Sequence, residues 1–158
     1  MIVLILQGLQ KILVVALLGP DRRSNNTMVK KTYNRPSGVH TPFSHYSHSV
    51  VVEGIDKLIM CAGQVSGDEH GNILGPDDFE AQGELVIENL RKVLNQAGAE
   101  LTDVIKLVSY VCSAHDVKKL RALVKKHFPD NPPGNTICVI SGLAHPDYLL
   151  EIDATAAI

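Results

Sequence analysis

Apolar residues recur with a period of about 3.6 between residues 78 and 97, which predicts an amphipathic helix. The positions that share its apolar face are Phe79, Val86, Leu90, Val93, Leu94 and Ala97. Asp77 can cap the first turn, Glu80 can close a capping box, and Gly98 supplies a left-handed stop. The pattern therefore defines both the face of this helix and its two ends.

The same period returns over residues 116–128, where apolar and basic residues occupy opposite sides of a second predicted helix. The apolar side holds Val117, Leu120, Leu123, Val124 and Phe128, and the basic side holds Lys118, Lys119, Arg121, Lys125 and Lys126. Pro129 and the pair at 132–133 end the helix. We call the five cations the basic stripe.

Runs rich in β-branched residues predict five strands. They are residues 49–52, 58–61, 102–112, 135–141 and 148–156. The first two flank the short polar segment 53–57, which predicts a β-hairpin. The resulting order, ββαβαββ, indicates an α+β domain with one mixed sheet and two helices on one face. The other face also needs a cover, and another subunit is the natural one.

The first 18 residues include 14 apolar ones, but their pattern is not typical of a signal peptide or a membrane span. The only charge, Lys11, lies in the middle, whereas a signal peptide carries positive charge first and a span has a clean apolar centre. We expect a packed hairpin of residues 2–6 and 12–18, or a short helix. Residues 1–27 then form an apolar head and polar linker, an accessory extension or an upstream translation artefact, and 28–158 form the domain.

Net charge, cysteine count and absent motifs limit the partners, the location and the enzyme classes that the sequence supports. Net charge is −2, from 15 basic and 17 acidic residues, so no global field favours nucleic acid or an anionic membrane. The three cysteines form no C-x-x-C pair, and an odd count does not indicate a disulfide framework, so we expect a reducing, cytoplasmic location. P-loop, G-x-S-x-G and H-E-x-x-H motifs are absent, which removes the usual signatures of three enzyme classes.

Two candidate sites remain. His40, His45 and His48 precede the first strand, but their spacing matches no standard zinc site, and we predict ordinary hydrogen-bonded histidines and no metal or cofactor. Glu151 lies between Leu150 and Ile152 in a strand that should be half-buried. A carboxylate in such a strand either pairs with another group or takes part in chemistry.

The series of residues from position 46 onward resembles the RidA/YjgF family, also called the endoribonuclease L-PSP or translation inhibitor family. The matching positions are Tyr46-Ser47, Cys61-Ala62-Gly63-Gln64, Gln82, Asn89-Leu90, Ala97-Gly98, Asp103-Val104, Phe128-Pro129, Pro133 and Glu151-Ile152. The resemblance covers about residues 44–157. It implies a chorismate-mutase-like fold and a homotrimer in which three sheets form a central barrel, with small-molecule clefts between subunits.

The family is best known for hydrolysing reactive enamines and imines to 2-keto acids and ammonia. By resemblance, Glu151 is the catalytic candidate, and the substrate-binding candidates are Tyr46, Gly63, Asn135 and Ile137. In the family's P-x-R segment an arginine clamps the substrate carboxylate, but this chain has Asn135 at that position. Losing such a charge-assisted pair costs about 2–5 kcal/mol in a desolvated cleft. Ile137 stands where many members carry a cysteine, and Cys138 should point the other way.

Three functions follow as hypotheses. The first is an imine or enamine deaminase with an altered substrate range, in which Glu151 activates water. The second is a non-catalytic trimer that binds or senses a metabolite, because the arginine is missing. The third is an endoribonuclease that docks RNA on the basic stripe, although we see no aromatic stacking platform beside it.

Overall fold

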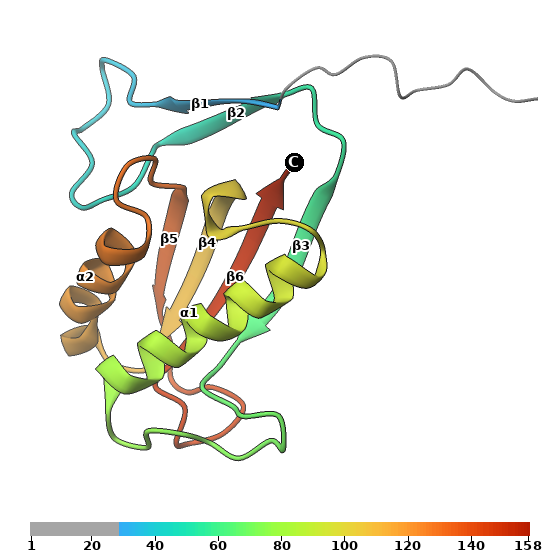
Figure 1. Cartoon of the computed structure of the whole chain (residues 1–158). Helices are drawn as coiled ribbons and strands as arrows, with labels where there is room; N and C mark the ends of the chain where they lie inside the picture. Colours follow the sequence, from blue (N-terminus) through green and yellow to red (C-terminus); the bar gives the residue numbers. More distant parts are fainter. Residues whose placement is uncertain (1–28) are drawn as a thin grey trace, which may run out of the picture.

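The computed structural model describes residues 29–158, and the predicted hairpin or helix of the head lies outside this part of the chain. The central element is a four-stranded sheet with the order β3-β6-β4-β5, formed by β3 (Leu58–Gln64), β4 (Val104–Val111), β5 (Gly134–Val139) and β6 (Leu150–Ala157). β6 pairs antiparallel with both β3 and β4, and β4 pairs parallel with β5. The sheet is therefore mixed, as the sequence predicted (Figure 1).

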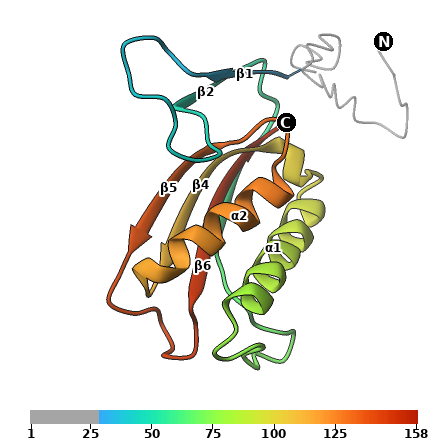
Figure 2. The ribbon, with the colours of Figure 1, turned by 90° about the vertical axis from the view of Figure 1, so that its left-hand side faces the viewer.

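Helices α1 (Phe79–Gln96) and α2 (Val117–His127) cover one face of this sheet. In Figure 2, which looks from the side, both helices lie on the same side of the strands. Their buried apolar side chains meet those of β4 and β6 in one core, whose fully buried members include Val86, Ile87, Leu90, Leu94, Leu107, Leu120, Leu150 and Ile152. The predicted α+β architecture with helices on one face is confirmed for the described part of the chain.

The predicted hairpin between residues 49–52 and 58–61 is wrong. β2 (Ser49–Glu53) pairs instead with a strand that the pattern did not predict, β1 (Lys30–Asn34), in an antiparallel ribbon separate from the four-stranded sheet. This ribbon crosses the upper end of the sheet in Figure 1. Both of its strands alternate exposed and half-buried residues. Such alternation shows that a segment is extended but does not specify its partner.

The N-terminal cap of α1 lies one residue later than predicted. Asp78, not Asp77, is the N-cap, and its Oδ1 accepts a 3.0 Å hydrogen bond from the Ala81 amide. Asp77 has a positive φ of 64°, which turns the chain into the helix. At the other end, Gly98 has a φ of 82°, and this confirms the predicted left-handed stop.

Candidate functional site

The sheet face that points away from the helices carries the polar groups with chemical potential. On β6, Leu150 and Ile152 point into the core, so Glu151 and Asp153 between them point to the other face, which we call the open face. Tyr110 of β4 lies opposite Glu151 in the antiparallel register. The alternation of two paired strands therefore brings two carboxyls and a phenol together.

Glu151 lies directly over Gly63 of β3. A Cβ atom added to Gly63 would come within 1.9 Å of Oε1 of Glu151, so the carboxyl occupies the space that a side chain at position 63 would need. The register of β3 against β6 shifts between Cys61 and Gln64, and this irregularity contains Gly63. Bulges of this kind redirect side chains next to functional sites. The structure thus brings together two of the residues that the sequence selected.

The electrostatics of the open face favour a protonated Glu151. Desolvation raises the pKa of Glu151, and the nearby negative charge of Asp153 raises it further. Within residues 29–158 no salt bridge joins either carboxylate to a cation. A carboxyl with a raised pKa is a better proton acceptor, and a better donor at neutral pH, than an ordinary glutamate.

Tyr110 and Cys138 complete this group. The Tyr110 hydroxyl donates a 3.3 Å hydrogen bond to Oδ2 of Asp153, and the charge of Asp153 together with burial raises the pKa of this phenol. Cys138 lies beside Tyr110 in the parallel register of β5 and is a free thiol. No pattern in the sequence singled out Asp153, Tyr110 or Cys138 as site residues. The two-residue spacing from Glu151 to Asp153 was the available signal for the first of them.

Two amides of α1 hold the loops on either side of this group. Buried Gln82 donates a 2.6 Å hydrogen bond to the carbonyl of Asp147 and accepts a 2.9 Å hydrogen bond from the Leu149 amide, just before β6 begins. Asn89 donates to the carbonyls of Val65 and Gly67, just after β3 ends. One helix therefore fixes the segment that follows Gly63 and the segment that precedes Glu151.

Asn135 and Ile137 lie on the helix-covered face of the sheet. Oδ1 of Asn135 accepts a 3.3 Å hydrogen bond from the buried hydroxyl of Ser109, and Ile137 packs against the core. Cys138 points the opposite way from Ile137, as alternation requires, but that is the face of Glu151. Within one chain, the structure does not bring Asn135 and Ile137 together with Glu151.

Tyr46 lies at the other end of the sheet from Glu151. Its neighbour Ser47 binds the carbonyls of Pro132 and Pro133, through its hydroxyl and its amide, just before β5 begins. Glu151, in contrast, is opposite Tyr110 near the end of β4. The Tyr46 ring meets His48 edge to face, with ring centroids 5.5 Å apart. One copy of the chain therefore does not join Tyr46 to the carboxyl group.

The three histidines before β2 bind main-chain carbonyls. Nε2 of His45 donates to the Phe128 carbonyl at 2.6 Å, and Nε2 of His48 donates to the His40 carbonyl at 2.8 Å. Nδ1 of His40 donates to the Thr41 carbonyl at 3.0 Å. The prediction of ordinary hydrogen-bonded histidines is confirmed. In the described residues no three His, Cys, Asp or Glu side chains are grouped to hold a metal ion. A search of the same residues for a helix long and apolar enough to cross a membrane also finds none.

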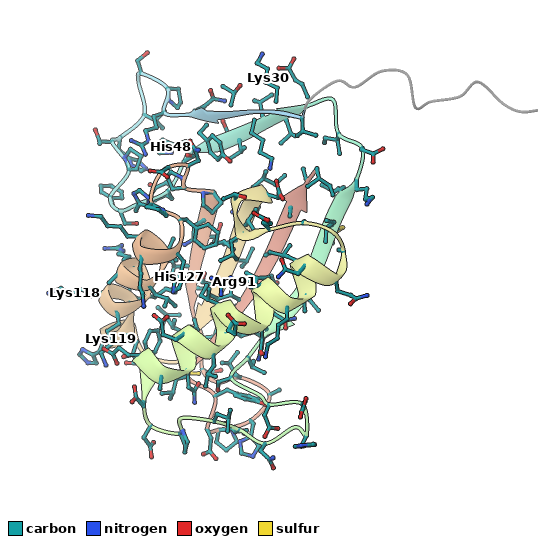
Figure 3. The ribbon with its side chains drawn as sticks, viewed as in Figure 1. Lys30, His48, Arg91, Lys118, Lys119 and His127 are labelled. Atoms are coloured by element: carbon teal, nitrogen blue, oxygen red, sulfur yellow. The ribbon has the colours of Figure 1, made fainter. Side chains whose placement is uncertain are left out.

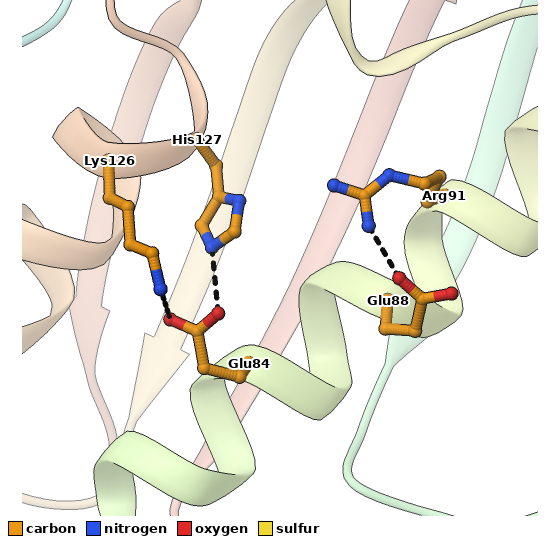
Figure 4. Close-up of polar contacts among 5 residues, drawn as sticks. All are labelled: Glu84, Glu88, Arg91, Lys126 and His127. Carbon is orange, nitrogen blue, oxygen red and sulfur yellow. Dashed lines mark hydrogen bonds and ion pairs between the residues drawn. The ribbon is translucent and has the colours of Figure 1, made fainter.

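The basic stripe of α2 is partly neutralised by acidic residues. Lys126 and His127 bind the carboxylate of Glu84 on α1, at 2.8 and 3.1 Å (Figure 4). Lys119 binds Glu80 and Asp116 at 3.2 and 3.5 Å. Side chains of α2 such as Lys118 and Lys119 project outward in Figure 3. The stripe is therefore not a continuous row of free cations.

A family model described as endoribonuclease L-PSP matches residues 38–158. A solved structure of a Rid-family protein of unknown function, YyfB from Yersinia pestis, is 31% identical and covers 81% of this chain and 98% of its own, with a TM-score of 0.73. A Mycobacterium tuberculosis member of the YjgF/YER057c/UK114 family is 26% identical, with coverages of 82% and 100% and a TM-score of 0.58. Yeast Mmf1, at 15% identity, coverages of 81% and 98% and a TM-score of 0.61, shares the fold.

Proposed function

Because this chain belongs to the endoribonuclease L-PSP family, which includes the Rid and YjgF proteins, we propose that it hydrolyses a reactive imine or enamine to a carbonyl compound and ammonia. The observation that carries this proposal is Glu151, a carboxyl with a raised pKa held over a glycine on the open face. Imine hydrolysis needs one group that both accepts and returns a proton, and such a carboxyl supplies it.

The reaction balances around Glu151. Water adds across the C=N bond: its oxygen bonds to the carbon, and its proton reaches the nitrogen through the carboxyl. The resulting carbinolamine then loses its hydroxyl proton to Glu151, the C–N bond breaks, and the same proton leaves with the nitrogen as ammonia. Burial, and after it the charge of Asp153, raises the pKa of Glu151, and the Tyr110 hydroxyl holds Asp153 in place.

The substrate cleft is proposed to lie between copies of the chain in a homotrimer. Tyr46 and Glu151 occupy opposite ends of one sheet, so a neighbouring copy is needed to place a Tyr46 ring over a Glu151 carboxyl. β5, like β3, is an outer strand of the four-stranded sheet, and the neighbouring copy is proposed to pack along the β5 edge. Asn135 and Ile137 enter the proposal as residues of that edge.

The substrate differs from the family's usual carboxylated one. On the open face, the nearest cation on β4 is Lys106, which lies four residues from Tyr110, about 13 Å along the strand. Lys106 already donates a 2.7 Å hydrogen bond to the Thr136 hydroxyl. A small substrate at Glu151 therefore meets no carboxylate clamp from its own chain, which favours an uncharged imine.

The test generates 2-aminoacrylate and an uncharged imine in situ and follows ammonia release. Wild type should hydrolyse the uncharged imine faster than background, and Glu151→Gln should lower that rate by at least about a hundredfold. Exposed Glu69 offers the matched control, since Glu69→Gln should leave the rate unchanged. Asn135→Arg tests the family's clamp. No rate above background in wild type or Asn135→Arg rejects the deaminase.

Among residues 29–158 no cation pairs with Glu151, and this, together with Asn135 at the arginine position, also favours a second candidate: a trimer that binds a metabolite without turning it over. A ligand that stays unmodified on the purified protein, seen by native mass spectrometry, together with equal rates for wild type and Glu151→Gln, would support this candidate over the deaminase.

The third candidate, an endoribonuclease, takes its support from the family's description and from the basic stripe. The acidic partners of Lys119 and Lys126 weaken that support. RNA cleavage that persists at high salt, or after Lys118, Lys119 and Arg121 are neutralised, would argue against the stripe as the docking surface.

A further inference from the structure

A pocket lies between α2 and the loop that precedes β2, and it shares no residue with the open face. Its volume is about 430 Å³, and its polar lining comes from Arg35, Thr41, Ser44, His45, Arg121 and Lys125. None of the residues from 29 to 158 that line it is an aspartate or a glutamate. The pocket therefore gathers three full positive charges and two hydroxyl groups without a carboxylate among them.

These cations carry no compensating charge in the described part of the chain. The salt bridges of α2 belong to Lys119, Lys126 and His127, and none includes Arg35, Arg121 or Lys125. Arg121 and Lys125 are four residues apart on one helix, where like charges cost about 0.2–0.5 kcal/mol. The C-terminal end of the helix dipole favours Lys125 in the last turn, but it does not account for Arg35 or Arg121.

The pocket wall is fixed by a hydrogen bond between the loop and the end of α2. Nε2–H of His45 donates to the Phe128 carbonyl at 2.6 Å, and this bond fixes the ring of a residue that lines the pocket. Beside the pocket, between Pro42 and Ser44, the Phe43 ring stacks on His40 with centroids 4.2 Å apart, yet Phe43 stays 74% exposed. An exposed aromatic ring thus lies on the same loop as the residues that line the pocket, although the ring itself is not part of the lining.

We propose that this pocket binds the phosphate group of a small phosphomonoester. Two guanidinium groups and an ammonium carry three positive charges, one more than is needed to neutralise a phosphate dianion, and arginine binds phosphate oxygens in pairs. The Ser44 and Thr41 hydroxyls can donate to the remaining oxygens. The volume exceeds that of a phosphate ion alone, which leaves room for the rest of the molecule. The proposal is independent of the deaminase chemistry, because it uses none of the residues of the open face.

The test titrates the full chain with inorganic phosphate and with adenosine 5′-monophosphate at low salt, by calorimetry and by amide chemical shifts. Saturable binding that shifts the Ser44 and Ala122 amides is the expected result. The double variant Arg121→Ala/Lys125→Ala should weaken binding by about tenfold or more, since each charge-assisted contact contributes more than an ordinary hydrogen bond. The nucleotide should bind more tightly than inorganic phosphate if Phe43 contacts the base.

Lys118→Ala is the matched control, because Lys118 is an exposed cation of the same helix that does not line this pocket. It should leave the affinity unchanged. Arg121→Lys keeps the charge and should bind phosphate more tightly than the double variant. The proposal is overturned if neither probe saturates, if the double variant and Lys118→Ala lose the same affinity, or if only an RNA oligonucleotide binds.

Discussion

At the scale of single residues, Gly63 and Glu151 define each other's geometry. The carboxyl occupies the volume that any side chain at position 63 would take, and its position over the strand is what desolvates it. A substitution at Gly63 therefore acts on the pKa and the position of Glu151 before it acts on anything else.

Gly63→Ala should displace the Glu151 carboxyl and destabilise the fold by about 1–3 kcal/mol, because the added methyl overlaps it. Urea denaturation measures the change in the free energy of unfolding. Gly142→Ala is the control, since nothing lies within 4 Å of a Cβ atom built there. Equal stability of Gly63→Ala and wild type would contradict the observed contact.

Glu151→Gln should raise thermal stability at about pH 8 and have little effect at about pH 4. The pKa of Glu151 is raised in the folded protein, so the folded state binds the proton more tightly than the unfolded state. The free energy of unfolding of wild type therefore falls as the pH rises from the ordinary glutamate range through the raised pKa, and glutamine removes this loss. Thermal denaturation at both pH values checks the sign, and a variant that is less stable at the higher pH contradicts it.

The sequence could identify Glu151 because a charge between Leu150 and Ile152 interrupts an apolar strand. It could not identify Tyr110 or Cys138, because their role depends on the register between β4, β5 and β6. The likeness to a family also assigned Asn135 and Ile137 to the same cleft between subunits as Glu151, and within one chain alternation along β5 puts them on the helix-covered face. A shift of one residue in strand register exchanges the two faces, and only coordinates fix that register.

At the scale of elements, α1 works as a frame for the site. Its apolar face is buried against the sheet, while two amides, Gln82 and Asn89, hold the loops that flank β6 and β3. The buried amide of Gln82 is compensated on both sides, as a donor and as an acceptor. The position of Glu151 therefore depends on a helix residue that does not touch it.

Gln82→Ala should lower the free energy of unfolding by about 1–3 kcal/mol, since the Leu149 amide loses its partner. It should also alter the amide shifts of the segment that leads into β6. Gln96→Ala, at the exposed end of the same helix, should change stability by less than about 0.5 kcal/mol. A Gln82→Ala variant as stable as Gln96→Ala would show that these hydrogen bonds do not contribute to the free energy of unfolding.

The helices were predictable because a 3.6-residue period with caps determines both location and orientation. The pairing of β2 was not, because short alternating strands have several possible partners. β1 reads as Lys30-Lys31-Thr32-Tyr33-Asn34, too polar to be recognised as a strand without its partner. Its ion pairs, from Lys30 to Glu53 and from Lys31 to Asp103, are long-range contacts that no local pattern contains.

At the scale of the whole molecule, the open face exposes large apolar side chains to water. Met60 and Leu58 on β3 are 80% and 56% exposed, next to strands whose other face is a dry core. Apolar side chains that line up on an exposed sheet face are typical of an interface between subunits. This exposed face is the one for which the sequence predicted another subunit as the cover.

Met60→Lys should shift the assembly toward monomers, because a charge buried without a partner opposes association. Sedimentation equilibrium measures the mass, and circular dichroism confirms that the variant is folded. Val93, which the sequence assigned to the apolar face of α1, is 37% exposed, and Val93→Lys should leave the mass unchanged. Wild type that is monomeric at every concentration, or Met60→Lys with the mass of wild type, would contradict the proposed trimer.

The strand order β3-β6-β4-β5 affects how the protein folds during its synthesis. β6 is the last described strand to leave the ribosome, yet it is an inner strand, and β3 and β4 have no contact as neighbours until it inserts between them. Until β6 has been synthesised, a nascent chain therefore carries β3 as a lone strand and β4 and β5 as a two-stranded sheet, with open edges that are prone to mispairing. Because β6 also brings both carboxyls, the chain acquires its sheet and its proton-transfer group at the same moment.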